Sequence, residues 1–127
     1  MHKISGVFSA ALTPVKSDLS INKDLYLRHC QYLMREGHDG LAIFGTTGEA
    51  NSFSVQEKKD HIDFLISNRR DPKILMPGTG SSSLKEAIDM TKHAANHKVR
   101  AVLLLPPFYY KNVTDEGVIN YYRHLIE

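Results

Sequence analysis

One short loop combines backbone freedom with hydroxyl groups: Gly45-Thr46-Thr47-Gly48-Glu49. It follows an apolar stretch over 40–44 that we expect to be a strand, and it precedes the helix-start pattern of Ser54 and Glu57. The loop should therefore lie at the carboxyl end of a strand, where α/β proteins build their sites. Its glycines let a ligand approach the backbone, and its threonines offer hydroxyl and N–H groups to an anion. Glycine and threonine also form ordinary turns, so the interpretation depends on the rest of the chain.

Similar strand–helix units follow one another along the whole sequence. Short apolar stretches predict strands, and apolar residues at helical spacing predict the helices between them. The expected strands cover 6–12, 40–44, 73–77 and 100–105, and the expected helices cover about 26–36, 54–70, 84–95 and 114–127. Apolar strands that alternate with helices are typical of an α/β fold whose parallel sheet is covered on both sides or closed into a barrel.

The length of the chain narrows this choice. A (β/α)₈ TIM barrel needs roughly 250 residues, whereas this chain has 127. An isolated four-stranded sheet would expose two apolar edges, which invite pairing with other strands. We therefore interpret residues 1–127 as four βα units, the amino-terminal half of a TIM-barrel domain. The chain would then be incomplete, or it would be a half-barrel that must find a partner.

Composition and charge exclude several classes of protein. The formal net charge is only +2, and the sequence lacks a basic stretch with interleaved aromatic residues, so we expect no nucleic-acid partner and no membrane-surface partner. Cys30 is the single cysteine, which leaves no disulfide framework. No apolar run is long enough to span a bilayer, and the amino terminus lacks the pattern of a signal peptide. The expected location is the cytoplasm.

Two histidines have the spacing of a metal-binding pair. His93 and His97 lie four residues apart on a predicted helix. No carboxylate lies between them, and no third ligand is evident in the sequence, so we interpret them as surface or helix-terminal histidines. The loop over 45–49 also lacks the lysine and the spacing of a P-loop, and no dinucleotide fingerprint is present. We therefore expect neither a metal nor a cofactor.

Five motifs, at the ends of successive predicted strands, carry a family resemblance. They are Gly6-Val7 through Leu12-Thr13-Pro14, Asp39-Gly40, the loop over 45–49, Pro77-Gly78-Thr79-Gly80 and Pro107-Phe108-Tyr109-Tyr110. Over essentially its whole length, the sequence resembles the dihydrodipicolinate synthase / N-acetylneuraminate lyase family. The resemblance implies a (β/α)₈ barrel, usually tetrameric, that condenses pyruvate with an aldehyde or runs the reverse cleavage. Pyruvate is held as a Schiff base on a lysine, where the iminium makes its methyl group acidic.

The resemblance also implies roles for single residues. Thr46 matches a threonine that relays protons together with tyrosines, and Tyr110 matches a relay tyrosine that reaches into the neighbouring subunit's site in many members. Thr47 matches the threonine whose hydroxyl and N–H bind the pyruvate carboxylate, and Gly48 belongs to the same substrate-binding loop. The functional unit would then be at least a dimer, and we expect a homo-oligomer of two or four subunits.

Three functional groups of the family lie on later strands and are absent here: the Schiff-base lysine, a second relay tyrosine and a carboxylate-binding arginine. Lys111 lies beside a predicted strand-end loop but does not match the family lysine, so we interpret it as a solvated charge. We therefore expect no aldolase activity from this chain alone. Ala50 and Val55 stand where lysine-inhibited synthases carry polar residues of the feedback site, which puts regulation by lysine in doubt.

Three hypotheses for function follow from these observations. The first is the amino-terminal part of a pyruvate-dependent Schiff-base lyase or synthase similar to dihydrodipicolinate synthase, acting on pyruvate or another 2-keto acid. The second is a sialic-acid or sugar-acid aldolase of the same family, because Phe108 before the tyrosine pair also occurs in such members. The third, of another class, is a non-catalytic half-barrel that binds a keto acid or assembles with a partner.

Overall fold

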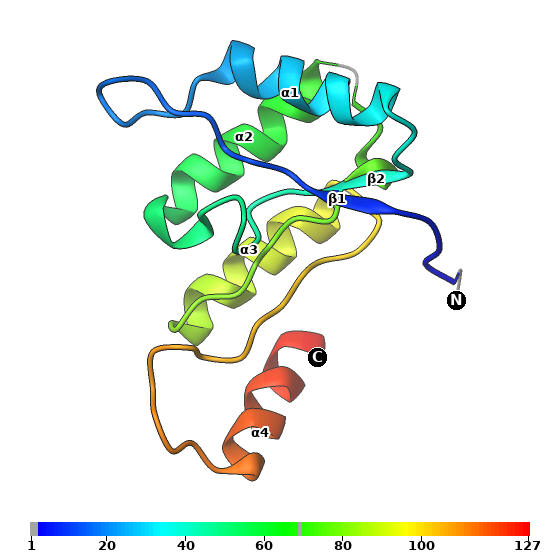
Figure 1. The fold of residues 1–127 in the computed structure, drawn as a ribbon. Coiled ribbons are helices and arrows are strands. Elements are labelled where there is room, and N and C mark those ends of the chain that lie inside the picture. The colour runs from blue at the N-terminus through cyan, green and yellow to red at the C-terminus, as the bar shows by residue number, and fades with distance from the viewer. Residues whose placement is uncertain (1–2, 69) are drawn as a thin grey trace.

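Strands and helices alternate along the chain in the computed structural model, which describes residues 3–68 and 70–127. The strands run in one direction, and α1, α2 and α3 follow one another along one side of them (Figure 1). This is the α/β order that the hydrophobic pattern predicts. The elements are β1 (Phe8–Ala10), α1 (Lys23–Arg35), β2 (Gly40–Ala42), the 3₁₀ turn η1 (Ala50–Ser52), α2 (Val55–Ser67), the 3₁₀ turn η2 (Pro72–Ile74), α3 (Leu84–Asn96) and α4 (Asp115–Ile126).

The four predicted strand positions are hydrogen-bonded side by side in chain order. β1 pairs with β2 in parallel, with Ser9 opposite Leu41. Leu41 also forms a parallel bridge to Leu75, and Gly78 forms the next one to Leu103. Parallel neighbours in sequential order, with helices on one side, are the arrangement found in one half of a (β/α)₈ barrel.

All four predicted strands are shorter than expected: β1 and β2 cover only part of the predicted ranges 6–12 and 40–44, and the last two ranges form no full strand. The ranges 73–77 and 100–105 form isolated parallel bridges instead of full strands, so the predicted extents are wrong there. Prolines explain the difference, because a proline has no N–H to donate to a ladder. The turn η2 occupies the beginning of the first range, and Pro77 accepts a bond of 2.9 Å from the N–H of Leu103 but cannot donate one.

Side-chain caps fix the beginnings of the helices. Ser54 accepts a hydrogen bond from the N–H of Glu57, whose carboxylate accepts one from the N–H of Ser54, so the predicted capping box of α2 is confirmed. Ser83 likewise caps α3 by accepting from the N–H of Glu86. The Glu86 carboxylate, however, accepts from the hydroxyl of Ser81 at 2.8 Å, so Ser83 and Glu86 do not form a complete capping box.

The main core lies between the strand segments and the first three helices. Its largest fully buried side chains come from both layers, so the strands and the helices bury each other's apolar faces. The strand layer contributes Leu41, Ile43, Phe44 and Leu75, and the helices contribute Tyr26, Cys30, Ile62, Leu65 and Met90.

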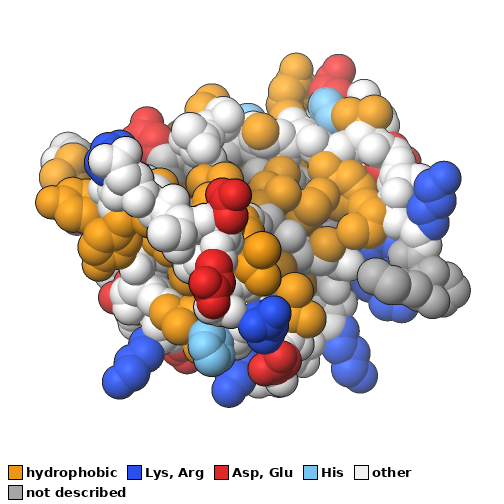
Figure 2. Space-filling model, turned by 90° about the horizontal axis from the view of Figure 1, so that it is seen from below, with side chains coloured by type: hydrophobic (Ala, Val, Ile, Leu, Met, Phe, Trp, Pro, Cys, Tyr) orange, Lys and Arg blue, Asp and Glu red, His pale blue; other side chains and the backbone are white. Residues whose placement is uncertain are grey.

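The other face of the strand layer is largely uncovered. Leu12 is 55% exposed, and Leu105 is 53% exposed at the end of the fourth strand position. Seen from below, the molecule displays several groups of hydrophobic side chains with charged side chains mostly around them (Figure 2). In a closed barrel this face is filled by layers of branched side chains.

Two adjacent tyrosines attach α4 to the strand-end loops. The Tyr121 hydroxyl donates a 2.8 Å hydrogen bond to the carbonyl oxygen of Ser81, and the Tyr122 hydroxyl donates one of 3.1 Å to the carbonyl oxygen of Leu104. This pair therefore holds the last helix against the preceding strand ends. None of the helices within 3–68 and 70–127 has the length and apolar character needed to cross a membrane.

Candidate functional site

The loop over 45–49 is a tight turn at the carboxyl end of β2, as predicted. The N–H of Glu49 donates to the carbonyl oxygen of Thr46 at 3.1 Å, which closes the turn. Phe44 and Glu49, on either side of the turn, both have φ of 53°, in the left-handed region that non-glycine residues rarely adopt. Phe44 is almost fully buried, and its ring packs near those of Tyr26 and Phe53. Packing thus holds a strained backbone immediately before the candidate site.

Close backbone approaches explain two glycines of this region. A Cβ atom on Gly48 would lie 2.9 Å from the carbonyl oxygen of Ala11, and one on Gly78 would lie 1.9 Å from that of Phe44. The hydroxyl of Thr13 also donates a hydrogen bond of 2.8 Å to the carbonyl oxygen of Gly48. The loop therefore lies directly against the first and third strand positions. A larger residue at either glycine would force these backbone segments apart.

A hollow of about 280 Å³ opens beside this loop. Its walls come from the ends of three neighbouring strand positions, as is usual for sites in parallel α/β folds. The loop contributes Thr46 and Glu49, the next strand end contributes Gly78 and Gly80, and the fourth contributes Leu103, Leu105 and Phe108. The volume suits a small organic molecule, and the mixed walls offer hydroxyl and backbone groups on one side and apolar side chains on the other.

The predicted site residues do not all meet in this hollow. Thr46 lines it, Thr47 is exposed in the same turn, and Gly48 is buried beneath the turn. Tyr110 lies elsewhere, in a small depression that it forms with Pro107 and residues of the following segment. The structure thus places the two threonines together but leaves the tyrosine outside the hollow of its own chain.

Tyr110 is more than half exposed and stacks edge to face with Tyr109. Their ring centroids are 5.7 Å apart at an interplanar angle of 83°, and Tyr109 is 75% exposed. Two aromatic rings that face solvent side by side form an apolar protrusion with two hydroxyl groups, a composition that suits contact with another protein surface.

A second hollow adjoins α2 and α3 and contains a buried lysine that the sequence did not single out. Lys58 is only 6% exposed, and burial lowers the pKa of its ammonium group, partly offset by the Glu86 carboxylate. Lys58 and Glu86 both line this hollow, together with Ser82. Lys58 follows Val55 by three positions in a helix whose beginning is marked by a cap. Residues three positions apart lie on the same face of a helix, so this spacing could have placed Lys58 on the face towards α3.

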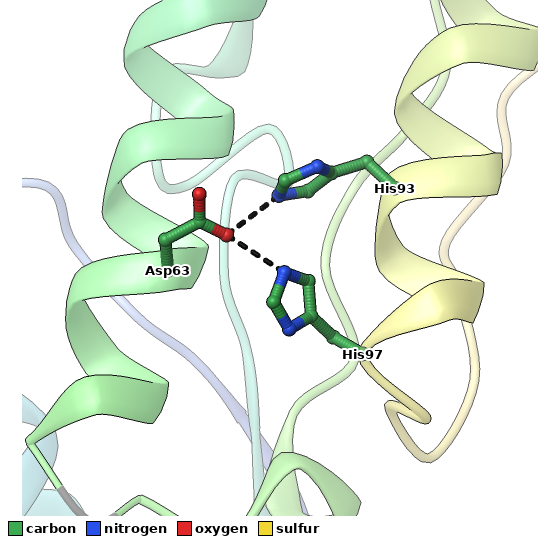
Figure 3. Close-up of side chains that lie close together, drawn as sticks. All are labelled: Asp63, His93 and His97. Carbon is green, nitrogen blue, oxygen red and sulfur yellow. Dashed lines mark hydrogen bonds and ion pairs between the residues drawn. The ribbon is translucent and has the colours of Figure 1, made fainter.

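Asp63 joins the two histidines that the sequence pairs. One oxygen of its carboxylate, Oδ1, lies 2.8 Å from Nε2 of His93 and 2.8 Å from Nε2 of His97 (Figure 3). No third ligand for these histidines is evident in the sequence, and the structure corrects that point by placing Asp63 beside them. Asp63 precedes His93 by thirty positions and lies on a different helix, so only the packing of α2 against α3 reveals the group.

Comparison with known proteins decides the family. The model of the "Dihydrodipicolinate synthetase family" matches residues 3–127, which is nearly the whole chain. The chain belongs to this family. The resemblance inferred from the strand-end motifs is therefore confirmed, and so is the fold class, because the related solved structures are TIM-barrel enzymes.

The chain spans about two fifths of the length of the relatives described here. A 4-hydroxy-tetrahydrodipicolinate synthase from Methanothrix thermoacetophila is 35% identical over 122 residues, covering 96% of this chain and 40% of that protein. An N-acetylneuraminate lyase from Rhizobium meliloti is 30% identical, covering 98% of this chain and 42% of that protein. The crystal structure of dihydrodipicolinate synthase from Agrobacterium tumefaciens superposes with a TM-score of 0.92 at 30% identity, covering 95% of this chain and 42% of that one.

Proposed function

We propose that this chain forms the amino-terminal half of a pyruvate-dependent Schiff-base lyase or synthase, with pyruvate or another 2-keto acid as its substrate. The observation that carries the proposal is the hollow beside the loop over 45–49, at the strand ends of a chain that belongs to this family. Active sites of TIM-barrel enzymes lie at this end of the strands.

Thr47 and Gly48 anchor the substrate carboxylate in this proposal. A carboxylate needs several donors that converge on it, and the turn over 45–49 can offer backbone N–H groups together with a threonine hydroxyl. Thr47 is exposed and Gly48 is fixed from below by Thr13 and Ala11, so the donors are available while the backbone that carries them is held. A rigid set of donors binds an anion without a cost for ordering the loop.

Thr46 and Tyr110 relay protons in the same proposal, and their separation within one chain requires a second subunit. Thr46 lines the hollow, whereas Tyr110 projects outward beside Tyr109. A tyrosine hydroxyl can both donate and accept, so a tyrosine from a neighbouring copy could complete the relay. The proposed assembly is therefore a homo-oligomer in which each site borrows a tyrosine from its neighbour.

The remainder of the barrel supplies the groups that residues 1–127 lack. In family members a lysine on a later strand forms the Schiff base, and further barrel strands would cover the exposed leucines at 12, 103 and 105. The proposed working form is thus a closed barrel in the cytoplasm, and we expect no cofactor because the lysine itself activates the substrate.

The experiment uses the protein as its own gene encodes it. Thr47→Val removes the hydroxyl but keeps the shape of the side chain, and we expect it to raise KM for pyruvate about tenfold to a hundredfold, the effect of one charge-assisted hydrogen bond. Thr47→Ser should restore most of the affinity. If the valine and serine variants bind pyruvate as tightly as the unaltered protein, Thr47 does not anchor the carboxylate.

The second candidate function is an N-acetylneuraminate lyase or sugar-acid aldolase, favoured by the 30% identical lyase from Rhizobium meliloti. Both candidates share the pyruvate half of the reaction and differ in the aldehyde. Turnover measured with pyruvate and a panel of short and sugar-derived aldehydes separates them, because an open-chain sugar acceptor is needed only for the second.

A further inference from the structure

A group of three potential metal ligands lies on the outer side of the α2–α3 packing, towards the carboxyl ends of both helices. The ligand atoms are Oδ1 of Asp63 and Nε2 of His93 and His97, and all three lie within 4.8 Å of one another. In Figure 3 the two imidazole rings extend from α3 and its end towards a single carboxylate on α2. None of the roles proposed for the hollow at the strand ends involves these residues.

The helix framework brings the three groups together. His93 and His97 are one turn apart, and their ring centroids lie 4.8 Å from each other. One turn earlier on both helices, the ammonium of Lys59 bonds to the carboxylate of Asp89. Two successive polar contacts therefore join α2 to α3, and Lys59, one turn before Asp63 on the same helix, is already paired with Asp89.

The ligand types select the class of metal. Two imidazole nitrogens and one carboxylate oxygen form a donor set that suits Zn²⁺, with one position left for water. Ligand atoms around a tetrahedral zinc lie about 3.3 Å apart, given bonds of about 2.0–2.1 Å. The 2.8 Å contacts between Asp63 and each histidine therefore need to open by about half an ångström, and any wider separation in the group, which spans up to 4.8 Å, needs to close to about 3.3 Å. Rotations of these partly exposed side chains can make both adjustments.

We propose that Asp63, His93 and His97 bind a zinc ion that cross-links α2 and α3. Asp63 and the histidines are partly exposed, with side-chain accessibilities of 48%, 21% and 33%, so a hydrated ion reaches them and a water completes its coordination. Without metal, Nε2–H of His93 donates a hydrogen bond to Oδ1 of Asp63, and Nε2 of His97 lies 2.8 Å from the same oxygen. A ligand that binds only the packed pair of helices stabilises the folded state.

The test uses the protein as its gene encodes it, without an added histidine tag, stripped of metal and titrated with zinc chloride in a calorimeter. We expect one zinc per chain and a higher melting temperature in its presence. His93→Gln, His97→Gln and Asp63→Asn should each weaken zinc binding by at least about tenfold. His124→Gln is the matched control, because His124 is an exposed histidine on α4, and it should bind zinc as the unaltered protein does.

Asp63→Asn separates metal binding from helix packing. Asparagine keeps an oxygen that accepts the hydrogen bond of His93 and can face His97, but an amide is a poor zinc ligand. We expect this variant to melt at nearly the same temperature as the unaltered protein without zinc and to lose the zinc-induced rise. The proposal is overturned if zinc does not bind, if it binds Asp63→Asn and both histidine variants as tightly as the unaltered protein, or if His124→Gln alone abolishes binding.

Discussion

The hydroxyl of Thr13 donates a hydrogen bond of 2.8 Å to the carbonyl oxygen of Gly48. Thr13 lies three residues beyond the end of β1, and Gly48 belongs to the loop that follows β2. This bond therefore fastens the candidate anion-binding loop to the neighbouring strand end. Ala11 restricts the same glycine, because a Cβ atom added to Gly48 would lie 2.9 Å from the carbonyl oxygen of Ala11. The position of the loop depends on β1 as well as on the loop's own sequence.

Removing the Thr13 hydroxyl should loosen this loop. In Thr13→Val the carbonyl oxygen of Gly48 loses its partner, which should lower the free energy of unfolding by about 1 kcal/mol and raise KM for pyruvate more than it lowers kcat. Urea unfolding and steady-state kinetics measure the two effects. Thr13→Ser keeps the hydroxyl and should restore KM; equal KM values in the valine variant and the unaltered protein would show that Thr13 does not position the site.

Gly78 should tolerate no side chain. A Cβ atom there would lie 1.9 Å from the carbonyl oxygen of Phe44, whose own backbone is held in the left-handed region. Gly78→Ala should therefore lower the free energy of unfolding by about 2–3 kcal/mol, because two adjacent backbone segments must move apart.

Gly45→Ala provides the matched control for this clash. The nearest atom to its added Cβ is Cδ1 of Leu103 at 3.8 Å, an ordinary contact. Thermal or urea unfolding of the two variants should differ clearly, with only Gly78→Ala strongly destabilised. Similar stabilities would mean that Phe44 and Gly78 are not as close as the structure places them.

The capping box of α2 should make stability depend on pH in acid. Backbone and hydroxyl hydrogen bonds from Ser54 lower the pKa of Glu57 below its ordinary value of 4.5. Because the pKa is lower in the folded state, this contribution to stability is fully present above pH 4.5 and is lost as the pH falls through the folded pKa.

Glu57→Gln should therefore be less stable than the unaltered protein at neutral pH, and the difference should shrink as the pH falls below 4.5. Ser54→Ala should cost about 1 kcal/mol at neutral pH. In the Ser54→Ala background, Glu57→Gln should have a smaller effect, which urea unfolding at several pH values would detect. A difference that does not change with pH would contradict this role for the carboxylate.

Cys30 should be inert in the folded protein. Its side chain is fully buried on α1, and burial raises the pKa of the thiol from 9.0 to about 12, so almost no thiolate is present at neutral pH. An alkylating reagent followed by peptide mass mapping should leave Cys30 unmodified under native conditions and modify it completely in denaturant. Rapid native labelling would show that α1 opens readily from the core.

Local signals in the sequence predicted most of the helices. Ser54, Ser83 and Thr114 all cap the helices that follow them, because a side-chain oxygen in the right place satisfies free N–H groups without help from the rest of the fold. Asn22 caps α1 in the same way, by accepting a hydrogen bond from the N–H of Leu25. The positions of most helices in the α/β order thus follow from local contacts within one helical turn.

Features that depend on distant contacts were harder to predict. The lengths of the strands around Pro77 depend on which backbone groups of the neighbouring strands they can bond to. The hydrogen bond between Thr13 and Gly48 joins residues thirty-five positions apart. Asp63 reaches His93 across thirty positions and two helices. The family motifs identified Thr46, Thr47 and Tyr110, yet only the structure shows that the threonines share a turn while the tyrosine lies outside their hollow.

The most direct test of the proposed function is to trap a Schiff base on the protein that its gene encodes. Mixing it with pyruvate and borohydride freezes an iminium as a stable adduct, which peptide mass mapping then locates. We predict one adduct per subunit, on a lysine outside residues 1–127, and none on a protein consisting of residues 1–127 alone. An adduct on Lys111, or on Lys58 with its lowered pKa, would contradict the assignment of the reactive lysine to the other half of the barrel. No adduct on any lysine would contradict the Schiff-base function itself.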